Sequence, residues 1–257
     1  MQTSYVRFSE TIQGKTIKAT DGEIGHCVDL LFDERYWTAR YLVVQTGSWL
    51  LGKKVIVPII SVEHVDPDTG EIEVKLSREK IENAPDIETD APVSRRQEMS
   101  ISDYYAHGYY WSLGHMWGTG LDPMALRNTA VPPPQERESQ TDKGDPHLRS
   151  LNEVIGYQVT VKSEQIATVA DAYVCPPNWY VSYLVLSTGN WLSREHSLLS
   201  PEWTQEISWI NRAISIDISK QMVESAPVFT PPLTDDQRDE LDEHYARKRA
   251  QLADERS

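Results

Sequence analysis

The ten residues YLVVQTGSWL at positions 41–50 return as YLVLSTGNWL at 183–192, with seven of the ten positions identical. The offset between the two stretches is 142 residues, and the same offset aligns 14–87 with 156–229 without a gap. Sixteen of the 74 aligned positions are identical, from the first glycine of each stretch to the Ala-Pro pair near its end. So long a match at one constant offset indicates that the chain contains one unit twice.

Each unit has the sequence pattern of short β-strands. Residues 41–44 and 183–186 are apolar at every position, which is typical of a central strand. In 24–32 we expect one apolar face, formed by Ile24, Val28, Leu30 and Phe32, and the second unit repeats it with Ile166, Ala170, Ala172 and Val174.

Further strands are expected in the first unit at 15–19, 54–58, 60–65 and 71–76, which makes about six and suits a small closed barrel. Ser77 and Ser219 stand where they cap a short helix that the Ala-Pro pair ends. The sequence therefore predicts an all-β fold of two tandem barrels with short helices.

The residues outside the two repeated units differ from them in composition, and this difference sets the expected domain boundaries. The first barrel repeat occupies 1–87, an irregular linker 88–147, the diverged second repeat 148–229, and a charged C-terminal helix 230–257. The linker combines prolines with six aromatics, which are Tyr104, Tyr105, Tyr109, Tyr110, Trp111 and Trp117. Thr234 and Gln237 form a capping-box signature at the start of the last helix, which carries a narrow apolar stripe and is expected to be solvated or lightly docked.

Charge and composition exclude several classes of function. The chain of 257 residues has 25 basic and 39 acidic side chains, a net charge of −14, and each of the four regions is acidic. Direct nucleic-acid binding is not expected, because it depends on clustered cations. Neither a membrane-spanning run nor the apolar core of a signal peptide is present, and the two cysteines do not make a disulfide framework. We therefore expect a cytoplasmic protein with reduced thiols.

The first unit resembles the PRC-barrel domain. The resemblance rests on Asp21 to Gly25, on Tyr41 to Val44 with Thr46-Gly47, on Val55 to Pro58, and on Ser77 to Pro85. This domain occurs in the photosynthetic reaction centre H subunit, in a ribosome maturation factor and in stand-alone bacterial proteins. The second unit departs from the pattern, with Ser163-Glu164 at the Asp-Gly turn and Ala167 at the next glycine.

The resemblance implies a non-catalytic module that docks on other macromolecules, and it carries no active site with it. We expect a binding or scaffolding protein that is not an enzyme and needs no cofactor. The alternatives are a small-molecule or metal-binding sensor, and an accessory factor like the reaction centre subunit or the ribosome factor. A homodimer or an internal pseudo-dimer of barrels is the expected assembly.

Six aromatic residues are the candidates for contact with a protein partner, because tyrosine and tryptophan carry much of the energy of interfaces. Trp49 and Trp191 occupy one position of the two units and are expected to line the seam between the barrels, while the others lie in the linker, at Tyr109, Tyr110, Trp111 and Trp117. The linker aromatics are expected to cover the barrels or to meet a partner.

The remaining chemical candidates have simpler interpretations. Asp29 and Asp171 are equivalent, and each is expected to face outward and to cap a turn or pair with a cation. His26 is expected on the apolar face of its strand, with Cys27 facing away from it. His107 and His115 have a spacing that matches no usual metal-ligand pair, and a metal site is not expected there.

Overall fold

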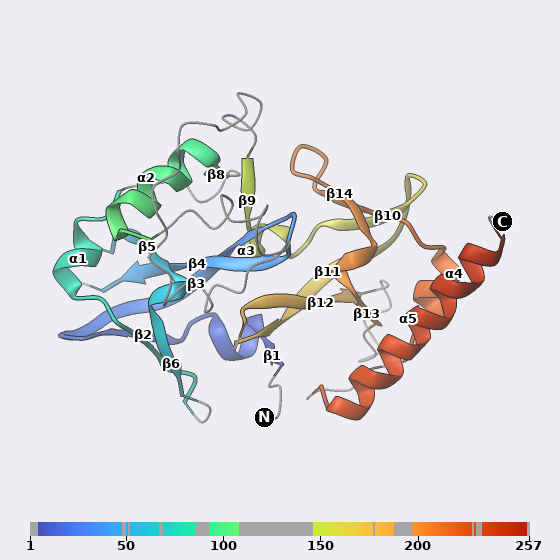
Figure 1. Ribbon diagram of the computed structural model, residues 1–257, viewed down its shortest axis with the longest axis horizontal. Helices are drawn as coiled ribbons and strands as arrows, with labels where there is room; N and C mark the ends of the chain where they lie inside the picture. The colour runs from blue at the N-terminus through green and yellow to red at the C-terminus, as the bar shows by residue number, and fades with distance from the viewer. Residues whose placement is uncertain are drawn as a thin grey trace.

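The computed structural model describes residues 5–47, 50, 52–66, 69–85, 93–107, 146–176, 178–187, 197–227, 229 and 233–255. Their strands form one mixed sheet of 15 strands, which runs across both halves of the molecule (Figure 1). The predicted β-rich class is confirmed. The sequence predicted two tandem barrels; in the structure the strands of both halves are hydrogen-bonded into one sheet.

The two halves contain the same elements in the same order. The first has β2 (Thr16–Ala19), β3 (Gly22–Asp33), β4 (Thr38–Thr46), β5 (Lys54–Pro58), β6 (Val62–Val65), β7 (Ile72–Val74) and helix α1 (Arg78–Glu82). The second has β10 (Gln158–Val161), β11 (Glu164–Cys175), β12 (Tyr180–Ser187), β13 (Ser197–Leu199), β14 (Thr204–Ser208), β15 (Ala213–Ile216) and α4 (Lys220–Glu224). The strand orders β6-β7-β2-β3-β4 and β14-β15-β10-β11-β12 correspond, and β2/β7 and β10/β15 are the equivalent parallel pairs.

Helix ends follow the predicted capping. The hydroxyl of Ser77 accepts a hydrogen bond from Lys80 N at 3.2 Å, and that of Ser219 accepts one from Met222 N at 3.3 Å. Thr234 and Gln237 exchange the hydrogen bonds of a capping box at the start of α5 (Asp235–Glu255).

Bulges in β3 and β11 change which side chains face the core. The pairing of β3 with β4 shifts between Cys27 and Asp29, so the strict alternation expected there is wrong. Cys27 is buried and His26 is exposed, the reverse of the prediction. The equivalent shift in β11 exposes Ala170 and buries Asp171.

Two segments that precede the halves are exchanged between them. Strand β1 (Val6–Arg7) pairs with β11 of the second half, with Val6 opposite Val174. Conversely, β9 (Pro146–Ser150), which leads through helix α3 (Leu151–Val154) into the second half, pairs with β3 of the first, with Arg149 opposite Phe32. Strand β8 (Val93–Ser94) pairs with β9 from its other side. Each half is therefore completed by a strand that belongs in sequence to the other.

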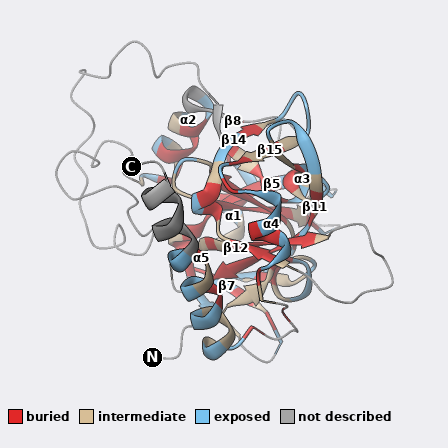
Figure 2. Cartoon of the chain, turned by 90° about the vertical axis from the view of Figure 1, so that its right-hand side faces the viewer, coloured by how far each residue is buried: buried red, intermediate tan, exposed pale blue. Residues whose placement is uncertain are grey.

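A helix that follows each half packs on it in the same way. In the first half it is α2 (Arg95–Tyr105), which lies within the predicted linker; in the second it is α5. The Tyr105 hydroxyl donates to Ile56 O at 2.7 Å, and the Tyr245 hydroxyl donates to Leu198 O, also at 2.7 Å. Ile56 and Leu198 are equivalent at the 142-residue offset. Leu241 and Tyr245 of α5 are buried, and the other described side chains of this helix are half-buried or exposed (Figure 2), so the helix is docked by a narrow stripe.

Because both hydroxyls are buried, Tyr105→Phe and Tyr245→Phe are each expected to lower the free energy of unfolding by about 1 kcal/mol, leaving a strand carbonyl without its donor. Chemical denaturation of the two variants measures this, with Tyr36→Phe at a half-buried turn position as the control. Losses that differ several-fold between the two sites would contradict the equivalence of the helices.

Candidate functional site

The two halves meet at a pair of equivalent tryptophans, Trp37 and Trp179. Ala39 N donates to Trp179 O at 2.8 Å, and Val181 N, its equivalent, donates to Trp37 O at 2.7 Å. Between these bonds, β4 and β12 pair through Thr38 and Tyr180. Both tryptophans have left-handed backbone angles, with φ of 51° and 60°, which turn the chain at the start of each strand. The contact is thus reciprocal, as in a symmetric dimer.

The rings of these tryptophans are in different environments. Trp179 is only 1 % exposed. Trp37 is partly exposed, and Phe32 stacks on one face of its indole with ring centroids 5.1 Å apart. The sequences before the two tryptophans also differ, since Glu34-Arg35 in the first half corresponds to Pro176-Pro177 in the second.

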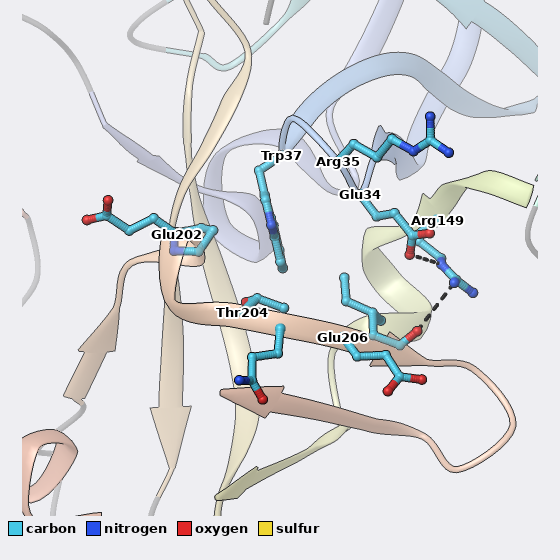
Figure 3. A pocket seen from close by; sticks show the side chains of 10 residues that line it. Glu34, Arg35, Trp37, Arg149, Glu202, Thr204 and Glu206 are labelled. Carbon is cyan, nitrogen blue, oxygen red and sulfur yellow. Dashed lines mark hydrogen bonds and ion pairs between the residues drawn. The ribbon is translucent and has the colours of Figure 1, made fainter. Parts of the chain in front are cut away.

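A cavity of about 590 Å³ lies at this place, between the two halves. Trp37 and the turn before it form one wall, the edge strand β14 forms another, and Arg149 of the exchanged strand β9 closes the third side (Figure 3). The lining residues are Glu34, Arg35, Trp37, Arg149, Pro201, Glu202, Thr204, Gln205, Glu206 and Ile207. Its volume is in the range of sites that bind small ligands or short peptide segments.

Arg149 links the walls of this cavity. Its Nε donates to the Glu34 carboxylate at 2.6 Å, and its Nη2 donates to Ile207 O of β14 at 3.3 Å. The guanidinium charge is therefore matched by Glu34, and Glu202 and Glu206 stand as exposed carboxylates on the opposite wall. The outer edge of β14 faces the cavity, since one of its carbonyls accepts a bond from across it.

Asp29 and Asp171 have structural partners. Both were expected to face outward, and both are buried, at 7 % and 1 % exposure. Asp29 accepts from Ser150 Oγ at 2.5 Å and Asn152 N at 2.9 Å, which caps α3. Asp171 accepts from Ser9 Oγ at 2.5 Å and from Arg7 Nε at 3.1 Å. The predicted capping and cation pairing are thus present, but each aspartate holds the segment exchanged from the other half.

Burial raises the pKa of Asp29 to about 6, despite the bonds from Ser150 and Asn152 that favour its charged form. The folded protein therefore binds this proton more tightly than the unfolded chain, and the contribution to stability is lost as pH rises through 6. Relative to Asp29→Asn, the wild-type protein is expected to gain about 1.4 kcal/mol between pH 8 and pH 5. Urea denaturation at both pH values measures this; a difference between the two proteins that does not change with pH would contradict it.

The six predicted partner-binding aromatics, Trp49, Trp191, Tyr109, Tyr110, Trp111 and Trp117, lie outside the described residues, as does His115. The other candidate histidine, His107, is half-buried against Tyr105, and its pKa is lowered by burial and by Lys80. Cys27 and Cys175 are buried and form no disulfide, and burial raises the pKa of the Cys27 thiol. Within the described part of the chain no group of three or more metal-ligating side chains gathers.

Sequence reasoning did not assign the seam to Trp37 and Trp179. The signal was available, because this pair is identical in the two units and stands in equivalent turns. Nor did it find the cavity residues Arg149 and Glu206, because they come from an exchanged strand and from the other half.

None of the described helices is long and apolar enough to cross a membrane. Comparison with protein-family models and with curated proteins finds no match to this chain.

Proposed function

We propose that this chain is a non-catalytic binding or scaffolding protein made of two PRC-type barrel units, which docks on partner proteins through barrel surfaces and the aromatic segment between the units. The matching strand orders and the reciprocal seam support an internal pseudo-dimer. The exchanged strands β1 and β9 tie the units together. Halves joined in this way are suited to presenting a surface.

One observation carries the docking role. At the tip of the β14–β15 hairpin, Trp209 is 44 % exposed and Ile210 is 86 % exposed. The equivalent turn of the first unit has the polar sequence DPDTG at 66–70. Neighbouring large apolar side chains exposed on a well-ordered turn are typical of protein contact sites. The buried aspartates support the same function, because both are engaged in structural bonds.

Affinity purification from cells with the intact chain and two variants tests this function. The first variant lacks 108–120, a deletion that spares the α2 residues packed on the barrel. The second combines Trp209→Ser with Ile210→Ser, and Glu73→Ser at an exposed strand position is the control. We expect the intact chain and the control to recover the same proteins and both variants to lose them. Recovery of the same proteins by all four, or of none by the intact chain, would contradict docking by these surfaces.

A small-molecule sensor is the second candidate, and the cavity of about 590 Å³ between the units favours it. Native mass spectrometry of the purified protein tests this candidate. A mass increment from a bound compound in the wild-type protein that is absent from Arg149→Met would support the sensor function. Spectra that show only the mass of the chain itself, in the wild-type protein and in the variant, would count against it.

A further inference from the structure

One hairpin contributes both a wall of the cavity and the exposed apolar tip. Thr204 to Ile207 of β14 line the cavity, and Trp209 and Ile210 follow directly on the same hairpin. Among the described strands, β14 pairs with β15 and stands at the end of the strand order. Its outer edge faces the cavity, where Ile207 O accepts the bond from Arg149. We call Trp37, Glu34, β14 and the Trp209–Ile210 tip the edge surface.

We propose that the edge surface binds an extended, lysine- or arginine-bearing segment of a partner protein, which adds as a strand to the outer edge of β14. This inference rests on the proposed docking function and names the site and the chemistry of the partner. Among the described strands the outer edge of β14 has no strand partner, and such an edge supplies backbone donors and acceptors for the addition; Ile207 O would exchange its bond from Arg149 for one from the segment. The apolar side chains of the segment would contact Trp209 and Ile210.

The preference for a basic segment follows from the charges and the aromatic ring. Phe32 covers one face of the Trp37 indole, so the cavity borders the remainder of the ring. A cationic side chain beside it gains a cation–π interaction. The Glu34 carboxylate is already paired with Arg149, so the Glu206 carboxylate on β14 is the charge offered to the segment. In Figure 3 the Arg35 guanidinium points away from this space. The net charge of −14 adds long-range attraction for a basic partner.

The edge surface is particular to the second unit's edge. At the equivalent seam position, Trp179 is buried and presents no ring to a ligand. The strand equivalent to β14 is β6, which is followed by the polar turn at 66–70 instead of an apolar tip. The proposal therefore includes a stoichiometry of one segment per chain.

Fluorescence anisotropy of labelled octapeptides with the full chain tests the proposal. The first peptide alternates lysine and valine. The second alternates glutamate and valine, and the third alternates lysine and proline, which keeps the charge but removes half of the backbone donors. We expect the lysine–valine peptide to bind at a ratio of one to one, and the other two to bind at least tenfold more weakly. Equal binding of the glutamate–valine peptide would overturn the charge preference, and equal binding of the lysine–proline peptide would overturn strand addition.

Matched variants locate the site. Glu206→Lys on β14 and Glu63→Lys on β6 make the same change in charge at exposed strand positions of the two units. Glu206→Lys is expected to weaken binding of the lysine–valine peptide at least fivefold, and Glu63→Lys less than twofold. Glu206→Gln serves as the milder variant, expected to weaken binding about twofold, if the reversal impairs folding as judged by circular dichroism. Equal effects in the two units would overturn the assignment to β14.

The failure of this proposal is distinguishable from failure of the docking function. If no peptide binds while affinity purification recovers partners that depend on Trp209 and Ile210, the docking function stands and the edge surface is wrong. If neither assay gives binding, both proposals fail.

Discussion

Trp179→Ala is expected to lower the free energy of unfolding by about 3–5 kcal/mol, the range typical of removing a large buried aromatic side chain. The ring is 1 % exposed and belongs to the core cluster that runs through both halves. The backbone bond from Ala39 N to Trp179 O survives the substitution, since it uses the main chain. The expected loss therefore reports the packing of the ring at the seam.

Trp37→Ala is the matched control, because the two residues share a backbone conformation and a reciprocal hydrogen bond. Its ring is partly exposed at the cavity, so less than half of the loss is expected. Guanidinium denaturation followed by circular dichroism measures both variants, and an unchanged m-value identifies the effect as a change in stability. Equal losses at the two positions, or a loss below about 1 kcal/mol for Trp179→Ala, would contradict this asymmetric account of the seam.

The sequence predicts local structure here because local rules determine it. Apolar runs such as 41–44 lie in central strands, and Ser77, Ser219 and Thr234 cap helices as their positions require. The bulges limit how well alternation predicts which side chains of a strand face the core. A shift of pairing by one residue reverses the faces of a strand, so alternation placed His26 in the core and Cys27 outside it. Nothing in the alternation of apolar residues marks where a bulge occurs.

The equivalence of α2 and α5 was hidden by a small change in spacing. Up to residue 87 the offset between the units is 142, but Ile101, Ser102 and Tyr105 correspond to Leu241, Asp242 and Tyr245 at an offset of 140. The side chains confirm the correspondence, since the Tyr41 hydroxyl lies 3.5 Å from Ser102 Oγ and the equivalent Tyr183 hydroxyl donates to Asp242 at 2.7 Å. The second unit has two residues fewer before its helix, so the gap-free match stops there. The packing of the helix on its half is nevertheless retained.

Long-range exchange is the part of the fold that sequence patterns did not predict. Strands β1 and β9 are short, and their partners lie more than 100 residues away in the other half. The strongest repeated tryptophan signal, Trp49 with Trp191, led to a predicted seam that lies outside the described residues, whereas the observed seam uses Trp37 and Trp179. The cavity depends on this exchange, because Arg149 reaches it only by pairing with the other half.

Asp171→Ala is expected to destabilise the protein by about 2–4 kcal/mol, because it removes three hydrogen bonds to a buried carboxylate and leaves the largely buried Arg7 paired with Glu10 alone. Arg7 is 15 % exposed, and its Nε donates to Asp171 at 3.1 Å, while Ser9 contributes two further bonds to the same carboxylate. All of these groups belong to the exchanged N-terminal segment. Its attachment to β11 should therefore weaken, and hydrogen exchange at 6–12 should rise more than in the rest of the sheet.

A double-mutant cycle with Arg7→Met separates the ion pair from the capping bonds. Loss of Asp171 should cost at least 1 kcal/mol less when Arg7 is already methionine, because the ion pair between Arg7 and Asp171 is then already absent. Asp29→Ala is the equivalent change in the other half; its partners are Ser150, Asn152 N and Leu30 N, so a smaller loss of about 1–3 kcal/mol is expected. A cycle without coupling would show that Arg7 contributes nothing to the attachment. In that case the exchanged segments of both halves would be held by the same serine-to-aspartate bond and strand pairing.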